Sequence, residues 1–478
     1  MPPPFEGALL NRIGIFAVLA ATAVAAAPAV TAQANPQPAR NVASAPVPQG
    51  LADKTLANGL EIIVMEDHSV PLVTINFAAK NGSYTEPPEL NGLSHLYEHM
   101  FFKSNRAIAN AEEYLHRIGQ LGIEYNGETQ EEVVQYYFTT ISQNLRPAMQ
   151  FMRDAIRYPL FDSTEFEQEK QVVIGEIDRN ESNPYYYLNK EMNDRLFYKY
   201  PSRKNPLGNR ATVSSATPAM MRLIQSRYYV PNNSALIVTG DVSAAQIFAL
   251  AQELYGDWPP RAKDPFVEFP IVEHPPLPKS EGAVIEQPVQ NVAIEIGWQG
   301  PSIGKDNPST YSADVFSFIL SQPNSRLQRD LVDKGLATAV GFGYYTQRNV
   351  GPITAIIQTT PEKAHEAIAA FYDEVSHFND PDYFTDAQLE NAKALLEADD
   401  LYSREKPDEY AKTLAFWYAS SGLDYFRGYL GRLRSTSRAD ISRYVTRYIL
   451  GKPHVGLALI APAVQQQIKL TPEELAGK

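Results

Sequence analysis

The sequence predicts an α+β protein built from two related halves. The chain has 478 residues, which is too long for one ordinary hydrophobic core. Segments with strand and helix patterns recur in a similar order on both sides of a proline-rich stretch, as after an internal duplication. That stretch, residues 258–282, contains seven prolines and cannot sustain a helix or a central strand. We therefore expect a first half at 51–257, a linker at 258–282 and a second half at 283–478.

The elements of the first half follow from apolar periodicity and from end signals. Runs rich in β-branched and apolar residues predict strands at residues 60–66, 71–79, 132–141 and 236–240. Helices are predicted at residues 93–103, 110–121, 145–157, 163–180 and 244–255. We expect Ser163 to cap the fourth of these helices.

The second half repeats this order of elements. Strands are predicted at residues 293–298, 337–345, 351–359 and 455–460. Helices are predicted at residues 309–320, 324–334 and 361–378, with further long helices after them. The chemical motif described below occurs in the first half alone, so the two halves are expected to differ in function.

The first residues have the pattern of a secretory signal peptide. Arg12 precedes an apolar run at residues 13–30, and the small residues of Ala32-Gln33-Ala34 suit signal peptidase. We expect a cleaved signal peptide at 1–34, a flexible tether at 35–50, and a periplasmic or secreted mature protein. A retained membrane anchor is the alternative, and no other stretch is long and apolar enough to span a bilayer.

Charge and cysteine content exclude several classes of function. The net charge of −13, with no basic block, argues against nucleic acid as a partner. The absence of cysteine excludes disulfides and thiolate metal ligands, and it is compatible with an oxidising compartment.

Five residues, His95-Leu96-Tyr97-Glu98-His99, carry the strongest chemical signal. In a helix, positions i and i+4 lie on one face, so both imidazoles would reach one metal ion with Glu98 beside them. This is the inverted form of the His-Glu-x-x-His zinc motif. A catalytic zinc normally takes three protein ligands, so a third must come from elsewhere in the chain.

Acidic residues of the predicted helix at 163–180 are candidates for the third ligand. Glu169 and Glu176 lie seven positions apart and share a helix face, whereas we expect Glu165 and Glu167 to belong to a solvated face. Glu176 follows the apolar residues 172–175, which suggest burial, and a metal would relieve the cost of burying its charge. Spacing alone does not choose among these carboxylates.

Together these segments resemble the pitrilysin family of zinc peptidases, the inverzincins, which include insulysin and the mitochondrial processing peptidases. Residues 92–104 (GLSHLYEHMFFKS) resemble the family's zinc helix, and residues 169–176 (EKQVVIGE) resemble its second zinc-binding segment. The separation of 77 residues between His99 and Glu176 is also similar. Further matches are residues 126–129 (NGET), similar to the edge of the family's substrate cleft, 228–233 (YYVPNN) and 238–241 (VTGD).

The resemblance implies a fold and a metal. The fold would be two homologous α/β-roll halves, each an antiparallel-rich sheet with helices packed on it, closing around a substrate chamber. One Zn²⁺ per chain would be held by His95, His99 and Glu176. Glu169 would orient one of these ligands.

The resemblance also implies zinc endopeptidase activity. Glu98 would be the general base that takes a proton from the attacking water and passes it to the leaving amine. An extended peptide would add a strand at the edge formed by Asn126, Gly127, Glu128 and Thr129.

The chain departs from the family in its second half. Active single-chain members carry an Arg and a Tyr that contact substrate and the oxyanion, and Val332 and Thr338 stand at these positions here. Arg329 or Tyr344 offers a local substitute. The interpretation we favour is that the chain is the zinc-bearing subunit of a pair, with a homologous subunit lacking zinc, or a second copy, as its partner. A binding or scaffold subunit whose peptidase activity has lapsed is the alternative function.

Overall fold

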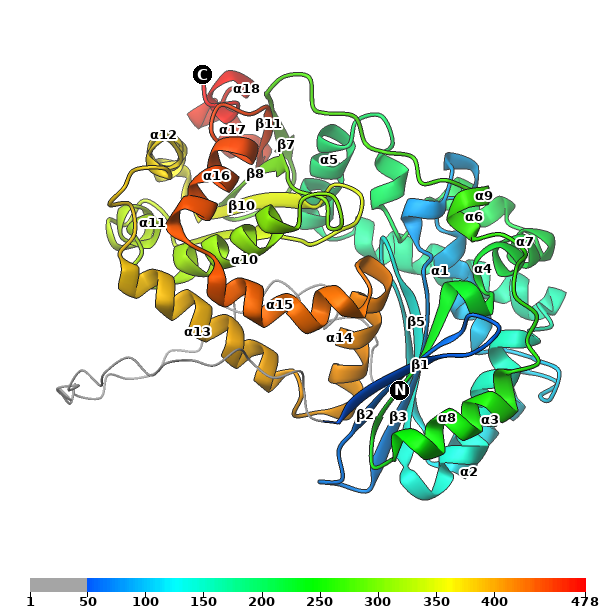
Figure 1. The fold of residues 1–478 in the computed structure, drawn as a ribbon. Helices are drawn as coiled ribbons and strands as arrows, with labels where there is room; N and C mark the ends of the chain where they lie inside the picture. Colours follow the sequence, from blue (N-terminus) through cyan, green and yellow to red (C-terminus); the bar gives the residue numbers. More distant parts are fainter. Residues whose placement is uncertain (1–49) are drawn as a thin grey trace, which may run out of the picture.

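The computed structural model describes residues 50–478, and they form two halves that lie side by side (Figure 1). The predicted signal peptide and nearly all of the predicted tether lie outside the described residues. Within the described part of the chain, no helix has the length and apolar character needed to cross a membrane.

The first half contains a six-stranded sheet with the order β1-β2-β6-β3-β5-β4. Its strands are β1 (Leu51–Thr55), β2 (Glu61–Glu66), β3 (Leu72–Ala79), β4 (Glu124–Thr129), β5 (Val134–Ile141) and β6 (Ser234–Gly240). Its helices are α1 (Leu93–Phe101), α2 (Ala111–Leu121), α3 (Leu145–Arg157), α4 (Ser163–Glu181), α5 (Pro184–Leu196), α6 (Arg210–Ser215), α7 (Pro218–Tyr228) and α8 (Ala244–Tyr255), with short 3₁₀ turns η1 (Ser83–Thr85), η2 (Pro88–Leu90), η3 (Ser142–Asn144), η4 (Pro201–Lys204) and η5 (Pro231–Asn233).

The second half contains a five-stranded sheet with the order β7-β11-β8-β10-β9. Its strands are β7 (Glu281–Glu286), β8 (Val292–Gln299), β9 (Ala339–Tyr344), β10 (Pro352–Thr359) and β11 (His454–Ile460). Its helices are α10 (Asn307–Ser321), α11 (Arg326–Gln328), the π-helical turn η6 (Arg329–Asp333), η7 (Pro361–Lys363), α12 (Ala364–His377), α13 (Asp386–Tyr402), α14 (Pro407–Ser420), α15 (Leu423–Ser435), α16 (Arg438–Tyr448), α17 (Pro462–Ile468) and α18 (Pro472–Leu475).

The two sheets have matching topology, which confirms the predicted pair of related halves. β2 pairs with β6 in parallel, as β7 does with β11, and every other pairing in either sheet is antiparallel. Between the halves the chain is irregular apart from the short helix α9 (Pro265–Glu268), as the prolines predict. β7 begins at Glu281, inside the range predicted as linker.

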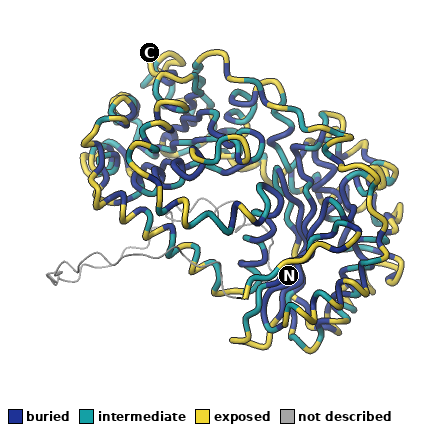
Figure 2. Tube along the Cα trace, viewed as in Figure 1, coloured by how far each residue is buried: buried dark blue, intermediate teal, exposed yellow. Residues whose placement is uncertain are grey.

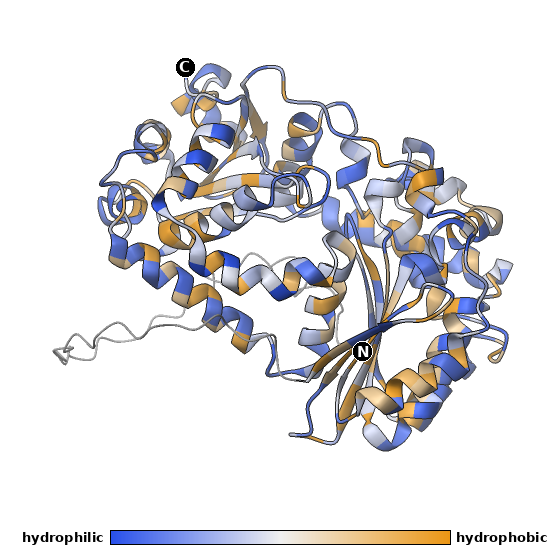
Figure 3. Cartoon of the chain, viewed as in Figure 1, coloured by the Kyte–Doolittle hydropathy of each residue, from blue (hydrophilic) through white to orange (hydrophobic). Residues whose placement is uncertain are grey.

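Each sheet is covered on one face by helices of its own half and on the other by a helix from the opposite half. α14 packs on the first sheet, where Leu414 and Tyr418 join a buried cluster with Ile63 and Ile237. α5 packs on the second sheet, where Met192 joins a similar cluster. The buried trace in Figure 2 is concentrated in the strands of both sheets. In Figure 3 the outer helices carry hydrophilic residues on one side and hydrophobic residues on the other, as expected for helices that cover a sheet.

Candidate metal centre

Helix α1 packs its apolar residues into the core and holds His95 and His99 on a different face. Leu96 and Met100 are buried in the main cluster of the first half. Because positions i and i+4 share a helix face, His95 and His99 lie together, and their ring centroids are 4.9 Å apart. The helix ends at Phe101, two residues before the predicted end.

The start of α1 is fixed by a buried carboxylate and a close backbone contact. Glu86 is 3% exposed and accepts hydrogen bonds from the backbone N–H groups of Gly92 (2.7 Å) and Ser94 (2.6 Å). Gly92 has a left-handed φ of 90°, and a Cβ there would lie 2.6 Å from the Cα of Gly208. A side chain at position 92 would therefore push the two segments apart.

Helix α4 supplies the third acidic residue of the centre. Phe166, Val173 and Ile177 bury one side of α4 in the core. Glu169 and Glu176 lie on the side that faces α1, as their spacing predicts. The two helices are packed against each other, so residues 70 or more positions apart in the sequence meet here.

Two details of α4 differ from the sequence prediction. The N-cap is Asp162, whose carboxylate accepts from the N–H groups of Thr164 and Glu165, so Ser163 is already the first helical residue. The apolar run before Glu176 does not explain its burial, because Val172 is 46% exposed. Contact with α1 leaves the Glu176 side chain 12% exposed.

His95, His99 and Glu176 lie close enough together to hold one metal ion. One donor atom from each lies within 4.8 Å of the other two. Glu176 Oε2 is 3.4 Å from His95 Nε2 and 3.5 Å from His99 Nε2. Ligand atoms about 2.0–2.2 Å from a tetrahedral zinc are about 3.3–3.6 Å apart, so these separations fit the ion.

The electrostatics also suit a dication. Burial, with the nearby charge of His99, lowers the pKa of His95 to about 4, so His95 is neutral as a metal ligand must be. Burial opposes protonation of His99 too, but its hydrogen bonds to Glu169 and Glu176 outweigh burial and raise its pKa to about 10. The carboxylates thus favour positive charge between the rings, and a bound metal ion would take the place of the His99 proton.

Glu169 holds the ring of His99 in place. His99 Nδ1 donates to Glu169 Oε2 at 3.1 Å, which leaves Nε2 directed at Glu176. The other oxygen of Glu169 pairs with Lys103 Nζ at 2.5 Å. Lys103 was not predicted as part of the site; it lies two residues beyond the end of α1 and reaches Glu169 from there.

Glu98 lies between the metal ligands and the edge strand β4. Its Oε2 accepts a hydrogen bond from Thr129 Oγ1 at 2.6 Å. A Cβ at Gly127 would lie 2.8 Å from Glu98 Cγ and 3.1 Å from Phe102, so glycine permits this close approach. Burial raises the pKa of Glu98 to about 7, which suits a group that takes and returns a proton near neutral pH.

Strand β4 is the last strand of its sheet, with one edge paired to β5. It contains all four residues predicted to bind substrate, Asn126, Gly127, Glu128 and Thr129. Gly127 and Thr129 face Glu98, and Asn126 is exposed. The substrate-binding role of these residues stays a prediction.

The prediction that Glu165 belongs to a solvated face is wrong. It accepts hydrogen bonds from the N–H groups of Ser104 (3.1 Å) and Ala111 (2.6 Å), and so ties α4 to the ends of α1 and α2. Its position one helical turn before Glu169 could have indicated that both carboxylates lie on the same face of α4. Glu167 is solvated, with its side chain 64% exposed.

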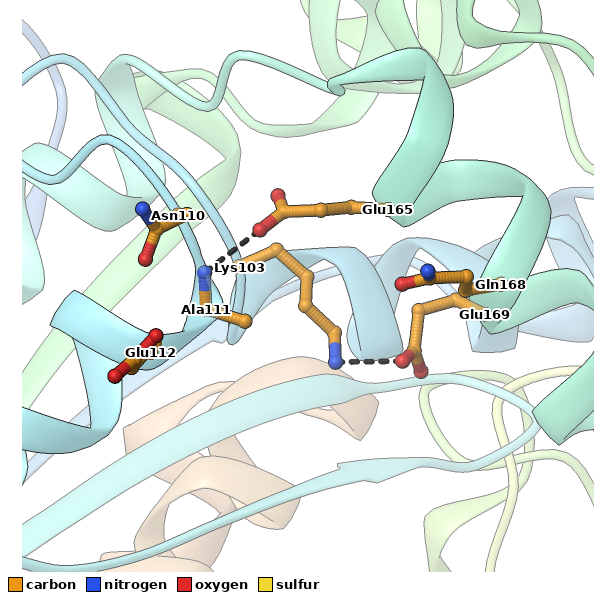
Figure 4. A pocket seen from close by; sticks show the side chains of 7 residues that line it. All are labelled: Lys103, Asn110, Ala111, Glu112, Glu165, Gln168 and Glu169. Atoms are coloured by element: carbon orange, nitrogen blue, oxygen red, sulfur yellow. Dashed lines mark hydrogen bonds and ion pairs between the residues drawn. The ribbon is translucent and has the colours of Figure 1, made fainter.

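A cavity of about 230 Å³ borders the metal centre at Glu169. Figure 4 shows Lys103 reaching Glu169 across it and Glu165 bound to the backbone of Ala111. Its lining is mostly polar, with Asn110, Glu112 and Gln168 completing the wall.

Three of the four second-half residues named above, Val332, Thr338 and Tyr344, are engaged within that half. Val332 packs against its core, and Thr338 Oγ1 donates to the Gln358 carbonyl at 3.1 Å. Tyr344 donates its hydroxyl to the Pro301 carbonyl at 3.0 Å, so this hydroxyl is not free to bind an oxyanion. Arg329 is exposed.

The chain is similar to known peptidases. The model of the insulinase family (peptidase family M16) matches residues 61–209, and that of the peptidase M16 inactive domain matches residues 215–396. The zinc protease PqqE of Helicobacter pylori is 21% identical over 82% of this chain and 89% of its own length. The uncharacterized zinc protease YmxG of Bacillus subtilis is 25% identical over 73% of this chain and 84% of its own.

Solved structures have the same fold. A protease from Helicobacter pylori superimposes with a TM-score of 0.76 at 21% identity, over 86% of this chain and 99% of the other. The periplasmic protease PqqL from Escherichia coli gives a TM-score of 0.73 at 18% identity, over 91% of this chain but 50% of PqqL. The chain therefore belongs to the M16, or insulinase, family of peptidases.

Proposed function

We propose that the chain is a zinc-dependent endopeptidase that hydrolyses peptides or small unfolded proteins in a closed chamber. One observation carries the proposal. His95, His99 and Glu176 gather at zinc-binding distances, and Glu98 is held beside them by Thr129 of an edge strand. The M16 relatives that are named zinc proteases support the same conclusion.

The chemistry divides between the ion and the side chains. Bound zinc would polarise the scissile carbonyl and acidify the attacking water. Glu98, with a pKa of about 7, takes the proton from that water and returns it to the leaving amine. Thr129 fixes the orientation of this carboxylate, and Glu169 fixes the ring of His99.

Among the described residues β4 pairs along one edge only, which supports recognition of an extended peptide at its other edge. A strand added there would run directly past Glu98, because Gly127 and Thr129 contact that residue. Most of the hydrogen bonds would go to the peptide backbone. Cleavage preference would then depend only weakly on substrate side chains.

A homologous partner belongs to the proposal, as a heterodimer with a non-zinc subunit or as a homodimer. Val332 and Thr338 provide neither the guanidinium nor the phenol that the family resemblance leads us to expect. The likeness to PqqL spans half of that protein, so PqqL has room for a second unit of this size. A second chain would supply the missing groups.

We propose an extracytoplasmic location for the mature chain. The proposal rests on the signal-peptide pattern of residues 1–34. The similar PqqL is described as periplasmic. N-terminal sequencing of mature protein that found Arg12 still attached would instead support a membrane anchor.

The second candidate is a binding or scaffold subunit with lapsed activity. It is favoured by the replacement of the Arg and Tyr by Val332 and Thr338. The intact set of metal ligands and general base favours the peptidase.

Metal analysis with a peptide-cleavage assay tests the proposal. The purified chain should contain one zinc per chain, and chelation should abolish cleavage until zinc is restored. Glu98→Gln should keep the zinc and lose turnover, because the amide cannot accept the proton. A zinc-loaded chain that cleaves no peptide, alone or with a homologous partner, would support the scaffold function instead.

A further inference from the structure

A loop of the second half is held by two buried charges of the first half. The loop, residues 345–351, connects β9 to β10. Glu132 is 6% exposed and accepts hydrogen bonds from the backbone N–H groups of Arg348 (2.7 Å) and Asn349 (2.9 Å). Hydrogen bonds to an ionised group are stronger than neutral ones, so Glu132 binds this backbone firmly.

Lys204 holds the same loop through its carbonyl groups. Its side chain is buried, and Nζ donates to the carbonyl oxygens of Asn349 (2.7 Å) and Val350 (2.9 Å) and to the side chain of Gln347. An anion thus binds the N–H groups of the loop while a cation binds its C=O groups. This pairing fixes both the position and the orientation of the loop.

The loop backbone is strained where these contacts converge. Val350 has a φ of 57°, in the left-handed region that β-branched residues rarely adopt. Such a conformation persists only where the surroundings impose it. Its N–H donates to Ser302 Oγ at 3.0 Å, and the Arg348 guanidinium donates to the carbonyls of Ala419 and Ser420 at the end of α14.

Glu132 lies in the turn between β4 and β5, three residues after Thr129, which binds the proposed general base. The turn is closed by the hydrogen bond from Gln130 N–H to the Val133 carbonyl at 2.9 Å. Thr129, which binds Glu98, directly precedes this turn. Gly82 packs so closely on the turn that a Cβ there would lie 2.3 Å from the Gln130 carbonyl oxygen. The turn therefore has little freedom to move independently of its neighbours.

Two side-chain hydrogen bonds also join the loop at residues 345–351 to strand β4. Tyr345 of the loop donates its hydroxyl to Gln130 Oε1 at 3.3 Å, and Gln130 Nε2 donates to Glu128 Oε1 at 2.6 Å. The loop of the second half is thus connected through Gln130 to Glu128 of β4, next to Thr129 in the chain. Both lie in the strand proposed to bind substrate.

We propose that residues 345–351, bound through Glu132 and Lys204, are a positioning element for strand β4 and for Glu98. The half without metal ligands would thereby contribute to turnover, although it touches neither the ion nor the reacting atoms. This inference rests on the proposed peptidase function. By this proposal the second half positions β4 and Glu98 in addition to helping to enclose the proposed substrate chamber.

Glu132→Gln in the full chain tests the inference, because the amide keeps the shape of the side chain and one acceptor oxygen. With zinc loaded and any required partner present, kcat should fall by about 10- to 100-fold, the range expected when a catalytic group shifts by up to about 1 Å. KM and zinc content should change little. Lys204→Arg should retain more activity than Lys204→Met, because the guanidinium still donates to the loop carbonyls.

Met192→Ala is the matched control. Met192 lies on α5 and packs against Gly297 of β8, so the alanine variant should weaken the contact between the halves away from the β4–β5 turn. If Glu132→Gln lowers kcat more than Met192→Ala at an equal loss of thermal stability, the positioning role is supported. Equal losses of kcat in the two variants would overturn it.

Amide hydrogen exchange gives a second readout that needs no activity. Glu132→Gln should speed exchange at residues 124–130 while exchange in α1 stays unchanged, and Met192→Ala should not affect residues 124–130. Unchanged exchange at β4 in Glu132→Gln would overturn the inference. If the zinc-loaded wild-type chain cleaves no peptide either alone or with a homologous partner, the proposed function fails while the exchange experiment still decides the structural role of the loop.

Discussion

At the scale of single residues, Glu169 and Glu176 of α4 contact different atoms of His99. Glu176 faces the Nε2 atoms of both histidines, whereas Glu169 binds Nδ1 of His99 and Lys103. The first arrangement suits a ligand and the second suits a group that orients a ligand.

The substitutions Glu176→Gln and Glu169→Gln should therefore differ. Glu176→Gln should abolish zinc binding, because a charged ligand is lost. Glu169→Gln should weaken zinc binding by roughly 10–100-fold without eliminating it. Competition with a chromophoric chelator measures both, and the exposed Glu167→Gln is the control on the same helix. Parent-like affinity in Glu176→Gln would mean that the third ligand is wrongly assigned.

A buried carboxyl in the second sheet makes stability depend on pH. Glu295 of β8 is 6% exposed, and burial raises its pKa from 4.5 to about 8. The folded state therefore holds this proton more tightly than the unfolded state does. Stability contributed by the neutral form is complete below pH 4.5 and is lost as the pH rises towards 8.

Glu295→Gln should remove this loss. We expect the melting temperature of the variant to exceed that of the parent increasingly as the pH rises from 4.5 to 8. A gain of about 1 kcal/mol corresponds to roughly 2–4 °C in a domain of this size. The exposed Glu286→Gln at the end of β7 should show no such trend. A difference between Glu295→Gln and parent that is constant with pH would contradict the prediction.

At the scale of elements, α1 is a short helix whose position depends on its N-terminus. It has nine residues, and isolated helices of that length are not stable in water. The carboxylate of Glu86 compensates two of its free N–H groups and the positive end of its dipole. The histidines of the metal centre are thus positioned partly by a residue that does not touch them.

Glu86→Gln should consequently loosen the metal centre. We expect a loss of about 1–2 kcal/mol in unfolding free energy, typical of a lost cap, and a severalfold weaker zinc affinity. Thermal unfolding and zinc titration measure these effects. Glu89→Gln, at an exposed position three residues on, is the control. Unchanged zinc affinity in a measurably destabilised Glu86→Gln protein would show that α1 is positioned by its core contacts alone.

At the scale of the whole molecule, α5 packs on the sheet of the second half and α14 on the sheet of the first, and these contacts make the two halves one structural unit. Each sheet would expose an apolar face without the helix from the opposite half. We therefore expect neither half to fold stably alone.

The missing Arg and Tyr lead to a prediction about assembly. The chain alone should be slow, because losing one oxyanion donor costs about 10²–10³ in turnover. A homologous subunit with Arg and Tyr at the positions of Val332 and Thr338 should raise its activity. Titration of peptide cleavage with that subunit, with the oligomeric state followed by light scattering, measures the effect. Full activity from a demonstrably monomeric preparation would contradict the prediction.

The sequence by itself located the parts of this protein that depend on local signals. The i, i+4 spacing predicted the pairing of His95 and His99, and apolar runs predicted most strands of both sheets. The assignment of Glu176 needed the family resemblance as well, because the predicted burial of the apolar run before it was only partly correct. β1, β4 and β7 were missed as elements, because short strands at a sheet edge carry weak patterns.

Only the tertiary structure decided how the halves depend on each other. Helices α5 and α14 each pack on the sheet of the opposite half. Glu165 binds the start of α2, and Glu132 and Lys204 bind residues 345–351, so these contacts join segments far apart in the sequence. No local pattern encodes such contacts, since the same buried Lys or Glu would be read as a surface charge. Their partners are backbone groups, whose positions exist only once both sheets have formed.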